Sequence, residues 1–277
     1  MVIVGNWKSG STLLQYLLAQ DKNIHNIFPN DKYPHNEGAL FLEKHLPIPH
    51  ELWGSYIPSV WLENNKNVIE LMANELNSMH NPECKFGLWR RPQLILRLNL
   101  VKRLLPNAKI IAIKRDILPN VYSMHKMFTR ERQQQPQVDI EYAGPFPPFW
   151  KEFSGKDITT SIERYVWQYH YIYNLVEDND IFTITYENLC NNTENTLRKI
   201  SKYIEHDIDI PIPKLTCFND EYKTGSELIS KNKQTEKGML EISNSSVVEL
   251  PPFTNEEIRL VRRLSRLYSH TDVLRFK

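Results

Sequence analysis

The chain has 277 residues, of which 41% are apolar, and its 34 basic and 33 acidic residues leave a formal net charge of +1. This composition is typical of a soluble globular protein, and one domain spanning residues 1–277 is the simplest arrangement for that length. The near-zero charge provides no long-range attraction to nucleic acid or to an anionic membrane, so we expect neither as a partner. Any anion site must be local.

The cysteines and the apolar runs indicate the compartment. Cys84, Cys190 and Cys217 are odd in number and widely spaced, which is typical neither of a disulfide framework nor of a metal cluster. No apolar run approaches the roughly 20 residues of a membrane span, and the first predicted strand leaves no room for a signal peptide. We therefore expect a cytoplasmic protein with reduced cysteines and no membrane segment.

The N-terminus predicts a unit of strand, loop and helix. The letters MVIV indicate a short buried strand, and STLLQYLLAQ carries leucines at helical spacing. Between the apolar parts of these stretches lies GNWKSGST, residues 5–12, which contains two glycines. This order is typical of a phosphate-binding loop.

Strands and helices continue to alternate along the chain. CKFGLW predicts a strand that leads into a helix over PQLILRLNLVKRLL, and AKIIAIKRD predicts a buried strand before a helix over residues 119–128. Then TTSIERYVWQYHYIYNLVED predicts a helix with an aromatic stripe and a capping box of Thr160 and Glu163. A strand over DIFTITY and a helix over TENTLRKISKYI follow. The alternation predicts an α/β fold, a three-layer α/β/α arrangement with a central parallel sheet.

Two segments lack this periodicity. Residues 129–158 are rich in glutamine and proline, and residues 205–253 are polar and irregular. Both are candidate lids over a site, and a plain surface loop is the alternative for the first. A last helix begins at a capping box of Thr254 and Glu257. Its arginines share one face and predict a solvated basic stripe of Arg259, Arg262, Arg263 and Arg266.

The first loop carries donors suited to an anion. The backbone N–H groups of residues 8–12 start a helix whose first turn has no internal acceptors, so they converge on a bound anion. The helix dipole adds partial positive charge at the same place. Gly5 and Gly10 allow a tight turn and a close approach of the backbone to the ligand. Three hydroxyl groups add further donors, those of Ser9, Ser11 and Thr12.

The position of the lysine distinguishes this loop from that of a nucleoside-triphosphate enzyme. In such enzymes a lysine directly after the second glycine reaches the β and γ phosphates, and the next hydroxyl holds magnesium. Here Ser11 takes that position, and Lys8 lies two residues before Gly10. The loop therefore favours a ligand with less charge and no obligatory metal.

Three blocks of the sequence resemble the sulfotransferase family. NWKSGST is similar to the family's Lys/Arg-Ser-Gly-Thr/Ser-Thr loop, which grips the 5′-phosphosulfate of 3′-phosphoadenosine 5′-phosphosulfate (PAPS). PNAKIIAIKRDILPNVYSMH resembles the strand and helix in which an arginine and a serine eight residues later hold the 3′-phosphate; here these are Arg115 and Ser123. ITYENLCNNTENTLRKISKYI is similar to the family's YEDL strand and the helix after it. The blocks follow one another in the family's order from residue 5 to about 204.

The chemistry of the second block also supports a nucleotide site. Arg115 follows a buried strand and offers a planar, permanently charged fork to a phosphate, and Ser123 adds a hydroxyl from the next helix. An ion pair between Arg115 and Asp116 is the structural alternative. The resemblance further implies nucleotide contacts at Tyr186, Lys237 and Gly238. For the tyrosine, packing as a strand-end aromatic is the alternative.

The resemblance also implies catalytic roles. Lys8 is the cation that stabilises charge on the leaving group. The general base is implied at Glu37, because HNEGALFLEKH is similar to a family pattern Lys-Glu-x-x-Phe-Phe. Histidines that titrate near neutral pH are rivals for this role, namely His35, His45 and His50. In GLWRRPQL, where other members carry a histidine, Arg90 and Arg91 cannot act as bases but can bind sulfonate or phosphate oxygens.

The resemblance implies a PAPS-dependent sulfotransferase that moves a sulfuryl group to a hydroxyl or amine of a small-molecule acceptor and releases 3′-phosphoadenosine 5′-phosphate (PAP). The small format resembles sulfotransferases of bacterial natural-product pathways, including those that act on saxitoxin-like alkaloids. Four tryptophans are candidates for lining an acceptor pocket, at positions 53, 61, 89 and 150. A P-loop small-molecule kinase and a non-catalytic nucleotide-binding protein are the alternatives.

Overall fold

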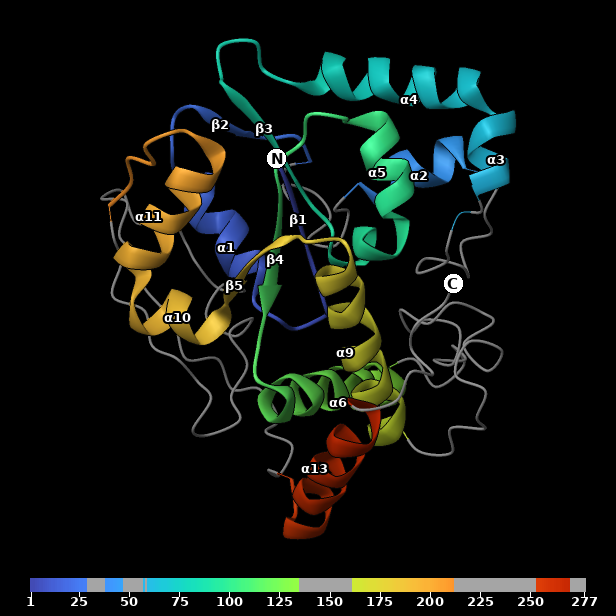
Figure 1. Ribbon diagram of the computed structural model, residues 1–277, viewed down its shortest axis with the longest axis vertical. Helices are drawn as coiled ribbons and strands as arrows, with labels where there is room; N and C mark the ends of the chain where they lie inside the picture. The colour runs from blue at the N-terminus through green and yellow to red at the C-terminus, as the bar shows by residue number, and fades with distance from the viewer. Residues whose placement is uncertain (29–37, 47–56, 58, 135–160, 212–252, 270–277) are drawn as a thin grey trace.

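Five parallel strands form the centre of the protein, with helices on both faces (Figure 1). The computed structural model describes residues 1–28, 38–46, 57, 59–134, 161–211 and 253–269. The strand order is β2-β3-β1-β4-β5, and every pairing is parallel. The strands are β1 Val2–Gly5, β2 Ile24–Asn26, β3 Phe86–Arg90, β4 Ile110–Lys114 and β5 Phe182–Thr185. The predicted three-layer fold with a parallel sheet is confirmed.

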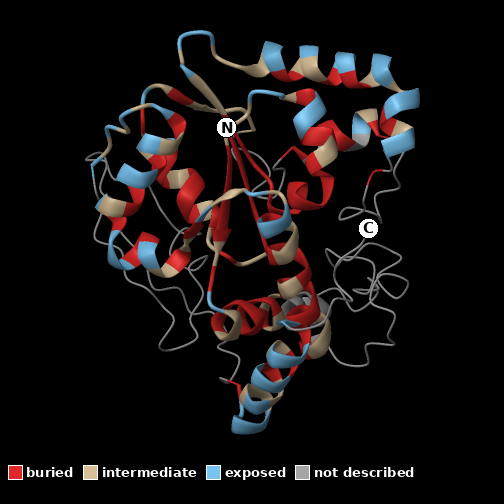
Figure 2. Cartoon of the chain, viewed as in Figure 1, coloured by how far each residue is buried: buried red, intermediate tan, exposed pale blue. Residues whose placement is uncertain are grey.

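The strands are buried on both faces, and this is why they appear in the sequence as continuous apolar runs. Val2 pairs with Trp89 of β3 and Ile110 of β4, which places β1 between them. Val2 and Val4 face one core cluster, whereas Ile3 faces the other. Figure 2 shows the buried strands in the middle and the exposed residues on the outer sides of the helices.

Each face of the sheet is covered by its own helices. On one face, α1 Ser11–Leu18, α10 Tyr186–Asn191 and α11 Thr193–Ile204 share a core with Ile3 and Ile113. The larger core lies on the other face and includes the 3₁₀ helix η2. The elements on that side are α2 Ala39–His45, α3 Ser59–Asn64, α4 Lys66–Met79, η2 Pro92–Arg97, α5 Leu98–Leu104, α6 Ile117–Gln134, α9 Ser161–Asp178 and α13 Asn255–Ser269. The part of the chain that the structure describes contains no helix long and apolar enough to cross a membrane.

The predictions for the C-terminal half are confirmed where the structure describes it. The aromatic stripe of α9 is buried, at Ile162, Tyr165, Val166, Tyr169, Tyr173 and Val176. The capping box of α13 forms, since Glu257 N–H donates to Thr254 Oγ1 over 3.2 Å and Thr254 N–H donates to Glu257 Oε2 over 2.7 Å. The four arginines of the basic stripe are exposed. Thr160 of the other predicted box lies outside the described residues.

Two predicted boundaries were wrong. The helix expected after β3 is divided into η2 and α5 at Arg97, whose φ of −127° and ψ of 31° are not helical. All six residues of η2 are buried, so packing from several sides overrides the simple helical pattern. The segment expected to be irregular from residue 129 is helical until Gln134, because α6 continues through residues with high helix propensity. Residues 135–158 lie outside the described part.

The sequence analysis assigned no structure between α1 and β3, where β2, α2, α3 and α4 lie. In α4 the buried positions Ile69, Met72 and Leu76 follow helical spacing, so pattern analysis could have found this helix. β2 has only three residues, Ile24–Asn26, and gives too short a pattern to detect.

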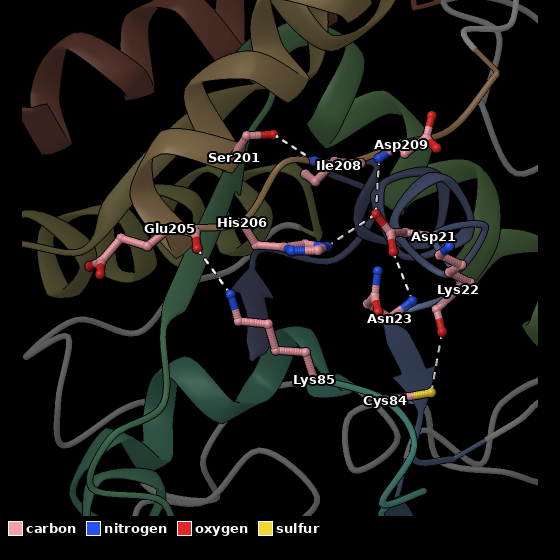
Figure 3. Close-up of polar contacts among 10 residues, drawn as sticks. All are labelled: Asp21, Lys22, Asn23, Cys84, Lys85, Ser201, Glu205, His206, Ile208 and Asp209. Carbon is pink, nitrogen blue, oxygen red and sulfur yellow. Dashed lines mark hydrogen bonds and ion pairs between the residues drawn. The ribbon is translucent and has the colours of Figure 1, made fainter.

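The chain that follows α11 is held against the turn after α1 (Figure 3). The buried carboxylate of Asp21 accepts a bond from Asn23 N–H (2.8 Å), another from Asp209 N–H (3.0 Å), and lies 3.3 Å from His206 Nε2. These contacts anchor residues 205–211, the first part of the predicted second lid. Residues 212–252 lie outside the described residues, and Phe253 packs its ring edge against Tyr122.

Candidate active site

The loop between β1 and α1 has a left-handed backbone at two places. Lys8 has a φ of 59° and Gly10 a φ of 98°. A Cβ on Gly10 would lie 2.4 Å from Cδ2 of Tyr186, so the ring permits only a glycine to approach this closely. The helix begins directly afterwards, with Leu14 N–H donating to the Gly10 carbonyl over 3.1 Å. The glycine at position 10 therefore matches the backbone shape of the loop, whereas Lys8 holds a left-handed conformation that residues other than glycine seldom adopt.

Donor groups gather where the loop enters α1. The N–H groups of the first helical turn precede the first intrahelical bond, and they point out of the helix N-terminus together with its dipole. Ser9 is fully buried near the hydroxyl of Tyr173, and its Oγ makes no well-formed hydrogen bond within the described residues. A buried hydroxyl without a partner is costly, and an anion at the loop would satisfy it. The chemistry of the loop thus fits the phosphosulfate group that the resemblance implies.

A network of buried side-chain amides supports the loop between β1 and α1. Asn6 Nδ2 donates to Asn120 Oδ1 over 2.9 Å, and its Oδ1 accepts from Gln168 Nε2 over 2.7 Å and from Trp7 N–H over 2.9 Å. Asn120 Nδ2 donates to the Trp7 carbonyl over 2.9 Å. The network connects the loop to α6 and α9, so the loop is set by side chains far away in the sequence.

The sequence analysis missed this network. Asn6 follows the first strand directly, and Gln168 is a polar residue among buried positions of an aromatic helix. Polar residues at core positions are the signal that could have identified both.

Arg115 lies at the carboxyl end of β4 and contacts the loop. Its Nη1 donates to the Lys8 carbonyl over 3.3 Å, and its guanidinium carbon lies 4.6 Å from the centroid of the Tyr186 ring. Tyr169 hydroxyl donates to the Arg115 carbonyl over 2.8 Å, and burial raises the pKa of this phenol, which keeps it a neutral donor. The structure thus places Arg115, Tyr186, Lys8 and Gly10 next to one another.

The neighbouring Asp116 has its own surroundings. Its N–H donates to Glu187 Oε1 over 3.1 Å. Burial, together with the charge of Glu187, raises the pKa of Asp116, and the charges of Arg115 and Lys114 act in the opposite direction. The contacts of the Arg115 guanidinium with Lys8 and Tyr186 direct it to the loop.

Ser123 lies on α6, eight residues after Arg115 in the sequence. It is buried, and its Oγ has no hydrogen-bond partner in the described ranges. A hydroxyl buried in this way is a second donor that a bound phosphate would satisfy. Ser9 and Ser123 are therefore among the predicted binding hydroxyls that the structure leaves buried without a well-formed hydrogen bond to the described residues.

Three buried arginines lie at and after the end of β3. Arg90 is the last residue of β3, Arg91 follows it directly, and Arg97 ends η2. Arg90 Nη1 donates to Thr12 Oγ1 over 2.9 Å and its Nε to Gln15 Oε1 over 2.7 Å, so it bonds to the first turns of α1. Burial, together with the nearby charge of Arg91, lowers the pKa of Arg97 to about 9. Because this value still lies above neutral pH, the guanidinium of Arg97 remains charged there. This positive region adjoins the loop on the β3 side, opposite Arg115.

Of the four candidates for the general base, the structure describes only His45. His45 Nε2 lies 2.6 Å from Glu75 Oε2, on α4, and its ring contacts Phe41. Figure 1 shows α4 across the end of the sheet where the strands begin, whereas the loop lies where β1 ends. Glu37, His35 and His50 lie outside the described residues, although the next residue after Glu37, Gly38, packs against Trp89 of β3.

The predicted tryptophans of the acceptor pocket and the late Lys-Gly contact also lie partly within and partly outside the described residues. Trp89 is buried between the rings of Phe28 and Phe41, at centroid distances of 5.5 and 5.8 Å, which makes it part of the core. Trp61 is half-buried on α3. Several candidates lie outside the described residues, namely Trp53, Trp150, Lys237 and Gly238. Within the described ranges, no group of three or more His, Cys, Asp or Glu side chains is arranged for a metal ion.

This geometry defines an α/β protein with a central parallel sheet and a tight glycine-containing loop between β1 and α1, and sequence comparison gives its family. Residues 1–209 match the Sulfotransferase family, which is more than half of the chain. The chain belongs to the sulfotransferase family, and it is a transferase. A comparison with curated protein sequences found no match.

Solved structures that resemble the chain are also sulfotransferases. Sulfotransferase STF9 from Mycobacterium avium matches with a TM-score of 0.45 and 14% identity, over 74% of this chain and 63% of the other, so this chain spans less than two thirds of its length. A sulfotransferase from Alicyclobacillus acidocaldarius matches with a TM-score of 0.45 and 15% identity, over 80% of this chain and 86% of the other. The sulfotransferase domain from the curacin biosynthetic pathway matches with a TM-score of 0.45 and 14% identity, over 98% and 97%. The family assignment depends on the match over residues 1–209.

Proposed function

We propose that the protein transfers a sulfuryl group from PAPS to a hydroxyl or amine of a small-molecule acceptor, without a metal ion. The observation that carries this proposal is the contact between the two nucleotide-binding blocks. Arg115 lies far from the loop in the sequence, yet its guanidinium bonds to the carbonyl of Lys8. A loop that binds the 5′ end of a nucleotide and an arginine that binds its 3′-phosphate must be neighbours, and these two are.

The residues present fit this donor. The N–H groups at the start of α1 and the hydroxyls of Ser9, Ser11 and Thr12 would hold the 5′-phosphosulfate. Arg115 and Ser123 would hold the 3′-phosphate, with Tyr186, Lys237 and Gly238 as further nucleotide contacts. When bound, PAPS supplies an activated sulfuryl group and a phosphate leaving group.

The chain's own residues perform the remaining tasks. The ammonium of Lys8 stabilises negative charge that develops on the leaving phosphate, and one lysine with backbone donors is enough for a group of low charge. A general base accepts the proton of the acceptor's hydroxyl or amine. We propose Glu37 for this role, with His35 and His50 as rivals; His45 is the weaker rival because it pairs with Glu75 on α4.

A two-part experiment tests this function. Binding of PAP is measured by calorimetry, and transfer from ³⁵S-labelled PAPS is measured against alcohols, phenols, amines and saxitoxin-like alkaloids, the acceptor class that we propose. We expect saturable PAP binding and transfer that persists in EDTA. Absence of PAP binding would overturn the proposal.

The alternatives have distinct outcomes in the same assays. Magnesium-dependent consumption of ATP with transfer to a small molecule would identify a P-loop kinase. Saturable binding of PAP without transfer to any acceptor in the panel would favour a non-catalytic nucleotide-binding protein.

A further inference from the structure

One chain of hydrogen bonds leads from β2 to the first turn of α1. Gln15 Nε2 donates to Asn26 Oδ1 over 2.9 Å, and Gln15 Oε1 accepts from Arg90 Nε over 2.7 Å. Arg90 Nη1 donates to Thr12 Oγ1 over 2.9 Å. Arg90 is 4% exposed and Gln15 5%, so water competes little with the bond between them, whereas the bonds to Asn26 and Thr12 are partly buried.

The polarity of this chain follows from its members. A guanidinium has only donors, so both atoms that face Arg90 must accept. This fixes the side-chain amide of Gln15 with its oxygen toward Arg90 and its nitrogen toward Asn26, in agreement with the bond that Gln15 makes there. The plane of the Arg90 guanidinium is therefore held from two sides, by Gln15 and by Thr12.

The same rule determines what Thr12 can do. Its hydroxyl has one proton and two lone pairs, and one lone pair receives the bond from Arg90. The proton of Thr12 is therefore directed to another acceptor, and a charge-assisted bond from a cation makes that hydroxyl a stronger donor. Thr12 belongs to the first turn of α1, where the N–H groups converge on an anion.

We propose that Arg90 is a positioning residue that sets Thr12 as a donor to the 5′-phosphate end of the bound nucleotide. This inference rests on the proposed function, and it assigns different ends of the ligand to the two arginines that flank β1. Arg90, on the β3 side, acts through Thr12 on the 5′ end. Arg115, on the β4 side, acts on the 3′-phosphate.

Three ligands separate these roles. PAP carries phosphates at both ends of the ribose, 5′-AMP only the 5′-phosphate, and 3′-AMP only the 3′-phosphate. Thr12→Val removes the hydroxyl and keeps the shape of the side chain, and Arg90→Met removes the charge and keeps much of the length. We expect each to weaken binding of PAP and 5′-AMP about tenfold or more, the effect of losing a bond to a charged group, and to leave 3′-AMP binding within about twofold.

The double variant tests whether Arg90 acts through Thr12. If it does, Arg90→Met combined with Thr12→Val weakens PAP binding no more than the worse single variant. Losses that multiply in the double variant would overturn the inference. Equal weakening of 3′-AMP and 5′-AMP would also overturn it, since that result indicates general damage to the fold.

A conservative variant guards against poor folding. Thr12→Ser keeps the hydroxyl that accepts from Arg90 Nη1, and it is expected to retain PAP affinity within about threefold. A loss of tenfold or more in Thr12→Ser with an unchanged melting temperature would contradict the donor role. If the wild-type protein binds PAP but the variants do not behave as expected, only this inference is rejected. If the wild-type protein binds no PAP, the proposed function and this inference are both rejected.

Discussion

The guanidinium of Arg115 lies 4.6 Å from the centroid of the Tyr186 ring, and the same ring packs against the loop at Gly10. The ring therefore contacts both the permanent cation and the loop, and the same guanidinium also donates to the Lys8 carbonyl of that loop. A cation above an aromatic face is stabilised by about 0.5–2 kcal/mol, more when it is desolvated, so this contact helps to keep Arg115 in place before any ligand arrives.

Replacing Arg115 by alanine should weaken PAP binding about tenfold or more, because a charge-assisted contact to the 3′-phosphate is lost. Calorimetric titration with PAP measures this directly. Arg103→Ala is the matched control, since Arg103 is a partly exposed arginine that pairs with Glu63 away from the site. Unchanged PAP affinity in Arg115→Ala would remove this residue from the nucleotide site, and Arg115→Lys gives a second reading if the alanine variant is unstable.

Lys8→Ala should reduce kcat by a factor on the order of 100 or more while PAP affinity changes little. The reason is that the ammonium is needed for charge that develops only during transfer. Single-turnover transfer and PAP titration measure the two quantities separately. The control is Lys102→Ala, whose lysine lies on α5 and bonds to Asn179. Full activity of Lys8→Ala would exclude this lysine from the mechanism.

Gly10→Ala should destabilise the protein by about 1–3 kcal/mol, from a left-handed φ of 98° and a Cβ placed 2.4 Å from the Tyr186 ring. Urea unfolding gives the free energy. Gly87→Ala is a milder control, because its new Cβ meets the flexible end of Ile27 at 2.7 Å and its backbone needs no positive φ. Equal effects of the two substitutions would mean that the tight approach of Gly10 to Tyr186 is unimportant for stability.

Asp21 should contribute to stability only above strongly acidic pH. Burial acts to raise the pKa of Asp21, but the bonds from Asn23, Asp209 and His206 outweigh it and lower the pKa below the ordinary value of 3.8. A carboxylate whose pKa is lower in the folded state stabilises the fold above pH 3.8, and this stabilisation is lost as the pH falls through the folded-state value. Asp21→Asn should therefore unfold more easily at pH 7 and show a smaller further loss below pH 4, as measured by urea unfolding across pH. The exposed Asp207→Asn is the control, and it should behave like wild type.

His170 should produce a different acid effect, at higher pH. Burial, together with the charge of Lys114, lowers the pKa of His170 from 6.5 to about 4, so the folded state holds the neutral ring. The unfolded chain takes up the proton first, so stability falls as the pH drops from 6.5 toward 4, by at most about 1.4 kcal/mol per pH unit for one proton. His170→Gln should flatten this slope, and NMR titration of the ring measures the pKa itself. A folded-state pKa near 6.5 would contradict the expectation.

The sequence was sufficient for features that depend on nearby residues. The strand, loop and helix at the N-terminus, the stripe of α9 and the capping box of α13 all follow from local patterns, and all three are present. Arg115 was placed at a strand end for the same reason. These predictions succeeded because burial and capping leave a periodic trace in the sequence.

The contacts between distant segments could not be predicted in the same way. That Arg90 bonds to Thr12, or that Asn6 bonds to Asn120 and Gln168, depends on the order of the strands in the sheet. No local pattern encodes that order. The boundary of η2 and α5 was wrong because tertiary packing, and not helical propensity, decides it.

Of the described strands, β1 comes first in the sequence and lies at the centre of the sheet, and the ring that packs against its loop belongs to residue 186. A chain emerging from the ribosome therefore carries β1 without neighbours until β3 and β4 have been made, and it carries the loop without Tyr186 for longer still. Contacts between residues so far apart in the sequence form late, because the entropy cost of ordering the intervening chain must be met before the contact stabilises the fold. The loop of residues 5–12 is thus synthesised well before Tyr186, and the contact between them can form only after the strands in between have been made.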